Sequence, residues 1–152
     1  LAIRRARPQV RVLATDASAQ ALAVAHDNAR RLGLAISLAQ GDWWAAAGAL
    51  RFALAVCNPP YVAASDSHLQ ALRHEPLAAL TPGGDGLSAL AQVIGGAPAH
   101  LLPGAWLLLE HGHDQATAVQ ALLHATGFEA VATRPDLAGL PRCTGGRWPA
   151  AQ

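Results

Sequence analysis

Short apolar runs alternate with helical stretches along all 152 residues, and this alternation restricts the fold more than any other feature. Residues 18–32, 87–99 and 113–126 carry apolar side chains at helical spacing. The first and last of these stretches run into Gly33 and Gly127, where helices commonly stop. The expected strands span 10–15, 36–40, 52–57, 105–110 and 128–133. The alternation predicts an α/β fold with a mostly parallel sheet covered on both faces.

The two ends of the chain add to this expectation. No helix separates the strand at 128–133 from a short sixth strand at 146–148, so we expect the last pair to be antiparallel. Residues 1–5 resemble the middle of a helix, and the sequence contains no methionine. We therefore expect one domain over residues 1–152 that is incomplete at its N-terminus. A strand followed by a Gly-x-Gly turn is expected upstream of Leu1.

Composition excludes several classes of protein. Apolar residues make up 52% and charged residues 14%, which suits a single domain with a core rather than a disordered chain. The net charge is +1, and the arginine cluster within residues 4–11 is too small to indicate nucleic-acid binding. No apolar run is long enough to cross a bilayer. Cys57 and Cys143 suit buried thiols in a reducing compartment, so we expect a cytoplasmic protein with no membrane partner.

Four polar residues end or follow a predicted strand. They are Asp16, Asp42, Asn58 and Glu110. In open parallel sheets, ligands bind beyond the carboxyl ends of the strands. The placement of these residues predicts that they converge on one functional edge.

Two of these acids have both a ligand-binding and a structural interpretation. Asp16 can accept hydrogen bonds from two ribose hydroxyls, or it can lie at a helix N-terminus and share the cap with Ser18. Position alone leaves these two open. Asp42 can accept from an exocyclic amine while the Trp43 indole packs on a flat heteroaromatic ring. Taken alone, this pair is better explained as an ordinary turn with a half-buried tryptophan.

The tetrapeptide Asn58-Pro59-Pro60-Tyr61 is the strongest local motif. The prolines fix φ and remove two backbone donors, and Pro59 keeps Asn58 out of the helical region. The resulting extended segment offers the Asn58 side-chain oxygen, a neighbouring backbone carbonyl and the aromatic face of Tyr61. Two acceptors suit a planar NH2 group and would orient its nitrogen towards an electrophile. A plain Pro-Pro turn is the alternative, but the asparagine, the tyrosine and the strand end favour function.

This motif resembles that of methyltransferases acting on amino groups, both adenine N6 and protein glutamine N5 enzymes. Three further stretches resemble the HemK/PrmC release-factor glutamine methyltransferases in particular. They are residues 73–87 (RHEPLAALTPGGDGL), 107–112 (LLLEHG) and 135–148 (PDLAGLPRCTGGRW). The resemblance covers essentially the whole chain. It implies a Rossmann-like class I methyltransferase fold whose first strand and Gly-rich loop are missing from this sequence.

The resemblance also implies roles for individual residues. The cofactor is S-adenosylmethionine, bound by the ribose-contacting Asp16, the adenine-contacting Asp42 and Trp43, and Asn58. Residues 58–61 (Asn58, Pro59, Pro60 and Tyr61) grip the substrate glutamine, and Asn58 and Tyr61 serve as the catalytic residues. The protein partner is a peptide-chain release factor, which would bring nucleic acid near only indirectly, through the ribosome.

Two other functions share some of these features. An adenine N6 methyltransferase would also use residues 58–61, but it would normally carry a basic target-recognition region. A non-catalytic remnant would explain the missing Gly-rich loop but not the intact tetrapeptide. We expect no metal site, and we interpret His111 and His113 as loop residues because no acid or cysteine lies near them at ligand spacing.

Overall fold

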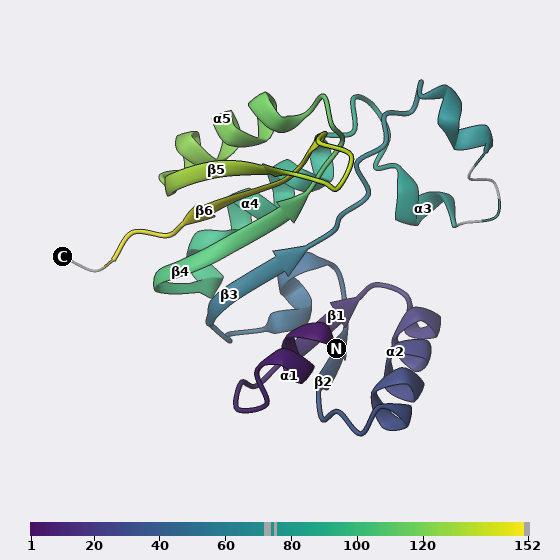
Figure 1. Cartoon of the computed structure of the whole chain (residues 1–152), viewed down its shortest axis with the longest axis vertical. Helices are drawn as coiled ribbons and strands as arrows, with labels where there is room; N and C mark the ends of the chain where they lie inside the picture. The colour runs from purple at the N-terminus through teal and green to yellow at the C-terminus, as the bar shows by residue number, and fades with distance from the viewer. Residues whose placement is uncertain (72–73, 75, 151–152) are drawn as a thin grey trace. The chain divides into compact units, whose positions relative to one another are not determined.

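The computed structural model describes residues 1–71, 74 and 76–150, which divide into two compact units, Leu1–Leu50 and Arg51–Gln152. Figure 1 shows the elements of both units. Arg73 and Glu75, which belong to the stretch that resembles the glutamine methyltransferases, lie outside the described residues. Each unit is described by itself below.

The first unit is a β-α-β arrangement preceded by a short helix. Its elements are α1 (Ala2–Ala6), β1 (Leu13–Asp16), α2 (Ala19–Arg31), β2 (Ser37–Gln40) and the 3₁₀-helix η1 (Trp43–Ala47). Strands β1 and β2 pair in parallel, from Leu13 opposite Ser37 to Asp16 opposite Gln40. Helix α2 begins after its N-cap Ser18, whose hydroxyl accepts from the Ala21 N–H at 3.2 Å. The predicted strand–helix–strand order of this region is confirmed.

The second unit contains a four-stranded sheet in the order β3-β4-β6-β5. Its elements are β3 (Phe52–Cys57), the 3₁₀-helix η2 (Ser67–Gln70), α3 (Leu77–Leu80), α4 (Ser88–His100), β4 (Leu101–Glu110), α5 (Ala116–Thr126), β5 (Glu129–Pro135) and β6 (Pro141–Arg147). Strands β3 and β4 are parallel, whereas β6 is antiparallel to both β4 and β5. The predicted antiparallel final pair is confirmed. The six predicted strands are all present, but their hydrogen bonds join them into two sheets, one in each unit.

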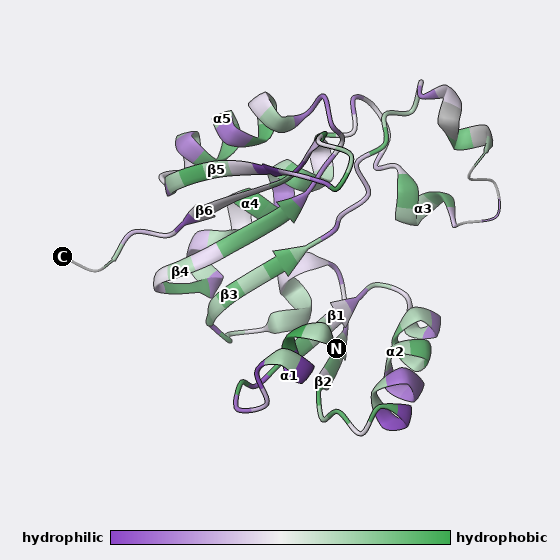
Figure 2. Ribbon diagram, viewed as in Figure 1, coloured by the Kyte–Doolittle hydropathy of each residue, from purple (hydrophilic) through white to green (hydrophobic). Residues whose placement is uncertain are grey.

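The core of the second unit lies between its sheet and the helices α4 and α5. Figure 2 shows hydrophobic colouring along the edge strand β3 and the carboxyl-terminal part of the neighbouring strand β4. The odd-numbered side chains Leu107 and Leu109 of β4 are fully buried, as are Ile94 of α4 and Leu123 of α5. Burial of each such side chain contributes about 1.5–3 kcal/mol.

The opposite face of this sheet does not match the expectation of cover on both faces. Leu54 and Val56 of β3 and Trp106 of β4 are 42%, 58% and 38% exposed. Leu54 pairs with Trp106, so these side chains share one face. The reason is that α4 and α5 contact each other and therefore lie on the same side of the sheet.

Over the described residues, no helix combines the length and the apolar character that crossing a bilayer would require.

Candidate functional site

The predicted cofactor-binding acids of the first unit lie at the ends of neighbouring strands. Asp16 is the last residue of β1, and Asp42 follows β2 after one glycine. The two strand ends are joined by a hydrogen bond from the Gly41 N–H to the Asp16 carbonyl, 3.1 Å long, and the Gln40 amide donates to the Ala17 carbonyl at 3.0 Å. The structure therefore brings Asp16 and Asp42 to one edge of the β1–β2 sheet.

The side chain of Asp16 is exposed, and one of its oxygens already has a local partner. Its Oδ1 accepts from the Ser18 N–H at 2.8 Å, in the turn that leads into α2. Ser18 rather than Asp16 is the N-cap of that helix. This hydrogen bond corresponds to the structural interpretation of Asp16, in which Asp16 and Ser18 together cap the helix. It also fixes the direction in which the second carboxylate oxygen can contact a ligand.

Asp42 and Trp43 form the start of η1 in an unusual backbone conformation. Asp42 is exposed and its side chain makes no cap hydrogen bond to η1. Trp43 has a φ of 47°, which is uncommon for a bulky residue and is found most often in turns and functional sites. Its side chain is half-buried. An exposed carboxylate beside a partly exposed indole can meet a flat heterocycle that carries an amino group.

In the second unit, the tetrapeptide from Asn58 to Tyr61 directly follows β3. Pro59 is buried, whereas Asn58 is exposed. In the described part of the chain, the Asn58 side-chain amide makes no hydrogen bond to the protein. Because β3 and β4 are parallel and Cys57 pairs with Leu109, Asn58 and Glu110 leave the same edge of the sheet. This edge is the one at which ligands collect in open parallel sheets.

The ring of Tyr61 is oriented by Glu110. The phenol hydroxyl donates to Glu110 Oε1 at 3.0 Å, although the two residues are 49 positions apart in sequence. Burial raises the pKa of the Tyr61 phenol above its usual value, and the hydrogen bond and negative charge of Glu110 act in the same direction, partly opposed by Arg142. The phenol therefore stays protonated and keeps donating at neutral pH. Arg142 also pairs with Asp136 at 3.5 Å.

The thiol next to this segment is not poised to react. Burial raises the pKa of Cys57 from 9.0 to about 11, so the thiol is neutral at physiological pH. Burial also raises the pKa of Cys143, helped by the charge of Glu110. Neither cysteine has the lowered pKa that nucleophilic catalysis needs.

His111 lies in the loop between β4 and α5, as predicted, but it is not a surface residue. Its side chain is fully buried. Nε2 lies 2.7 Å from Thr144 Oγ1 and Nδ1 lies 2.8 Å from the Gly112 carbonyl. The burial of His111 was not foreseen, because its partner Thr144 is 33 residues away in sequence. His113 lies in the same loop, as predicted, and is exposed. Among the described residues, no three histidine, cysteine or acidic side chains gather as metal ligands would.

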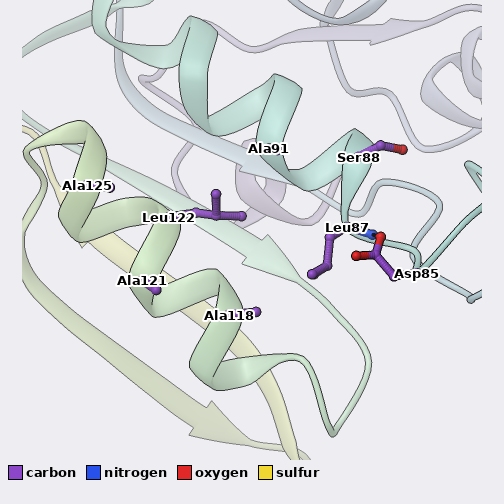
Figure 3. A pocket seen from close by; sticks show the side chains of 8 residues that line it. All are labelled: Asp85, Leu87, Ser88, Ala91, Ala118, Ala121, Leu122 and Ala125. Carbon is purple, nitrogen blue, oxygen red and sulfur yellow. Dashed lines mark hydrogen bonds between the residues drawn. The ribbon is translucent and has the colours of Figure 1, made fainter.

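A shallow groove between α4 and α5 contains none of the predicted site residues. Figure 3 shows its lining, which is mostly alanine and leucine with Asp85 at one end. The Asp85 carboxylate accepts from the Leu87 N–H at 3.0 Å at the start of α4. The rest of the lining is apolar apart from Ser88, and we assign the groove no chemical role.

The predicted residues are therefore brought together as two sets. Asp16, Asp42 and Trp43 belong to the first unit, and the segment from Asn58 to Tyr61 belongs to the second. Sequence reasoning missed one residue at the second set, Gln115, because the helix was expected to start at residue 113 and starts at Ala116 instead. This shift makes Gln115 the N-cap, where a polar side chain can turn back onto the preceding loops.

Comparison with known proteins identifies similar sequences. The sequence profile of the methyltransferase small domain family matches residues 1–109. A release factor glutamine methyltransferase of Xylella fastidiosa is 53% identical over an alignment of 152 residues that covers 98% of this chain and 55% of that protein. One of Bordetella pertussis is 53% identical over an alignment of 142 residues that covers 91% of this chain and 53% of that protein. The chain spans about half the length of these curated relatives.

Solved structures share the fold. A methyltransferase from Pyrococcus furiosus matches with a TM-score of 0.68 at 14% identity, covering 99% of this chain and 68% of that one. A protein-(glutamine-N5) methyltransferase from Alicyclobacillus acidocaldarius matches with a TM-score of 0.52 at 24% identity, covering 97% and 87%. The predicted methyltransferase fold is confirmed. The resemblance seen in the sequence motifs is also confirmed, since the curated relatives carry the name of the family that these motifs resemble.

Proposed function

Because the chain belongs to the methyltransferase small domain family, we propose that the protein methylates the side-chain amide nitrogen, N5, of a glutamine in a peptide-chain release factor. One observation carries the proposal. The Asn58 amide, which makes no hydrogen bond to the described residues, and Tyr61, whose hydroxyl donates to Glu110, leave the same sheet edge of a chain whose relatives at 53% identity are release factor glutamine methyltransferases. The proposal extends to the setting of such an enzyme, in translation termination and in the cytoplasm.

The chemistry of the first unit fits S-adenosylmethionine as the cofactor. When bound, this cofactor supplies an electrophilic methyl group on a sulfonium. Asp16 would accept from the ribose hydroxyls with its carboxylate. Asp42 would accept from the adenine amino group, and the Trp43 indole would pack against the adenine ring. These three residues of the first unit contribute binding and orientation of the cofactor.

The acceptor amide would be held by the segment from Asn58 to Tyr61. The Asn58 side-chain oxygen accepts one N–H of the glutamine amide, and a backbone carbonyl of the rigid Pro59-Pro60 stretch accepts the other. With both hydrogens held, the amide nitrogen points in a fixed direction, although its lone pair is delocalised into the carbonyl. Tyr61 presents its ring beside the amide because its hydroxyl is tied to Glu110. Orientation and exclusion of water then supply most of the catalysis.

The decisive experiment offers the complete protein two acceptors. S-adenosylmethionine with a labelled methyl group is supplied together with a glutamine-containing release factor and an adenine-containing DNA duplex. We expect label on the glutamine side chain and none on the DNA. Label on adenine without label on glutamine would refute the proposal in favour of an adenine N6 methyltransferase. Absence of transfer to either acceptor would favour the non-catalytic remnant.

An Asn58→Ala variant tests the role of the free amide. Because Asn58 makes no hydrogen bond within the described part of the chain, its removal should leave the melting temperature nearly unchanged. Methyl transfer should fall on the order of 10²-fold, as expected when a reacting group loses its orientation. A fall in activity that only follows a loss of folded protein would instead identify Asn58 as a turn residue.

A further inference from the structure

Gln115 joins three separate segments of the second unit through one side-chain amide. It is the N-cap of α5 and is only 9% exposed. Its Oε1 accepts from the Gly112 N–H at 2.9 Å. Its Nε2 donates to the Tyr61 carbonyl at 2.9 Å and to the Asp85 carbonyl at 3.3 Å. The same side chain thus holds the loops that follow β3 and β4 and the turn before α4.

The tetrapeptide needs hydrogen bonds from other segments to fix its position. Pro59 and Pro60 have no N–H, so this stretch cannot fix itself through its own backbone donors. Tyr61 is instead hydrogen-bonded at two points: its carbonyl accepts from Gln115, and its hydroxyl donates to Glu110. The backbone of the next residue is also held, since the Val62 N–H donates to the Leu80 carbonyl at 2.9 Å.

A glycine makes room for this contact. A Cβ on Gly86 would overlap with the Tyr61 carbonyl oxygen and would lie 2.8 Å from Gln115 Nε2. The φ of Gly86 is +80°, which also favours glycine. The Tyr61 carbonyl therefore lies directly against the main chain at Gly86, with the Gln115 amide completing its surroundings. This packing leaves the carbonyl one position to occupy.

We propose that Gln115 is a positioning residue, which fixes the main chain of Tyr61 and thereby the segment that binds the acceptor amide. The inference rests on the function proposed above and assigns to it a residue outside the tetrapeptide. Gln115 acts through Tyr61 and does not touch the substrate. Its loss should lower kcat, because the acceptor nitrogen is aligned less often, without changing cofactor affinity. A misplacement of about 1 Å in such a site can cost on the order of 10²-fold in rate.

The test compares Gln115→Glu with Gln120→Glu in the complete protein. Glutamate at 115 keeps an acceptor for the Gly112 N–H but replaces the donor by an oxygen that repels the Tyr61 carbonyl. Gln120 is a matched control, because it lies on the same helix and its Nε2 also donates, to Thr133 Oγ1 at 2.8 Å. We expect a fall in kcat on the order of 10²-fold for Gln115→Glu only, with the Kd for S-adenosylmethionine within about twofold of wild type. If Gln115→Glu does not fold, Gln115→Met removes the donor without adding charge.

A spectroscopic measurement separates this inference from the proposed function. Tyr61 is the only tyrosine among these 152 residues. In the complete protein labelled with fluorotyrosine, its ¹⁹F resonance is the one that disappears in Tyr61→Phe. We expect the resonance to move towards the position of free fluorotyrosine in Gln115→Glu and to stay in place in Gln120→Glu. An unmoved resonance, a kcat equal to that of wild type, or an equal fall in both variants would overturn the role of Gln115. If the wild-type protein methylates no glutamine, the proposed function fails, while the resonance still decides whether Gln115 positions Tyr61.

Discussion

Replacing Thr144 by valine should test the hydrogen-bond chain that runs from His111 to Gln120. Thr144 Oγ1 is fully buried and lies 2.7 Å from His111 Nε2 and 2.7 Å from Thr133 Oγ1. Valine has nearly the same shape, so the substitution removes the hydroxyl without opening a cavity. The buried His111 Nε2 then has no partner, whereas Thr133 keeps the hydrogen bond from Gln120.

The expected loss of stability follows from these contacts. A buried polar atom left without a partner costs about 1–3 kcal/mol, and an ordinary hydrogen bond contributes about 1 kcal/mol. The added apolar methyl group of valine offsets part of this. We therefore expect the free energy of unfolding to fall by about 2–3 kcal/mol. With a urea m-value of about 2 kcal/mol/M for a chain of this size, the midpoint should fall by about 1–1.5 M.

Urea denaturation followed by circular dichroism measures this loss, with Thr126→Val as the control. Thr126 Oγ1 donates to the Leu122 carbonyl at 2.8 Å, four residues earlier in its own helix. Its removal leaves no buried group without a partner, so the control should lose less than about 0.5 kcal/mol. A Thr144→Val midpoint equal to that of the control, at an unchanged m-value, would refute the importance of the chain from His111 to Gln120.

Three further outcomes are expected. Tyr61→Phe keeps the aromatic ring but loses the 3.0 Å hydrogen bond to Glu110, so kcat should fall by about tenfold or less. A fall in kcat as large as that of Asn58→Ala would contradict this expectation. Folding raises the pKa of Cys57 from 9.0 to about 11, so the neutral thiol stabilises the folded state below pH 9 and this contribution is lost as the pH rises to about 11. Urea denaturation across this range should show a fall of about 2–3 kcal/mol in the free energy of unfolding, which Cys57→Ala should lack. Asp16→Ala should weaken S-adenosylmethionine binding by about tenfold or more in calorimetry on the complete protein, and unchanged affinity would leave only its structural role beside Ser18.

The sequence by itself determined the secondary structure and the local motif of the acceptor site. Strand β3 spans Phe52–Cys57 as predicted, because a short apolar run favours a strand and the following Asn-Pro-Pro keeps the backbone extended. Helix α2 begins after Ser18 and ends before Gly33 as predicted, because capping residues act within one turn of the helix end. The exposed Asn58 at the end of β3 follows from the same local rules.

Strand β6 shows where such rules fail. A short strand was expected near residues 146–148, but β6 spans Pro141–Arg147. A Cβ on Gly145 would lie 2.9 Å from the Leu107 carbonyl, and one on Gly146 would lie 3.0 Å from Phe128 Cβ. These glycines permit close packing against β4 and Phe128, and that requirement exists only once the segments meet.

Only the tertiary structure decided which polar groups hold the site in place. His111 and Thr144 are 33 residues apart in sequence, and Gln115 and Tyr61 are 54 apart. Each of these residues could satisfy its hydrogen bonds in water, so its sequence neighbourhood does not select a partner. Burial selects it, because a polar atom removed from water is stable only beside a donor or acceptor that the fold brings to it.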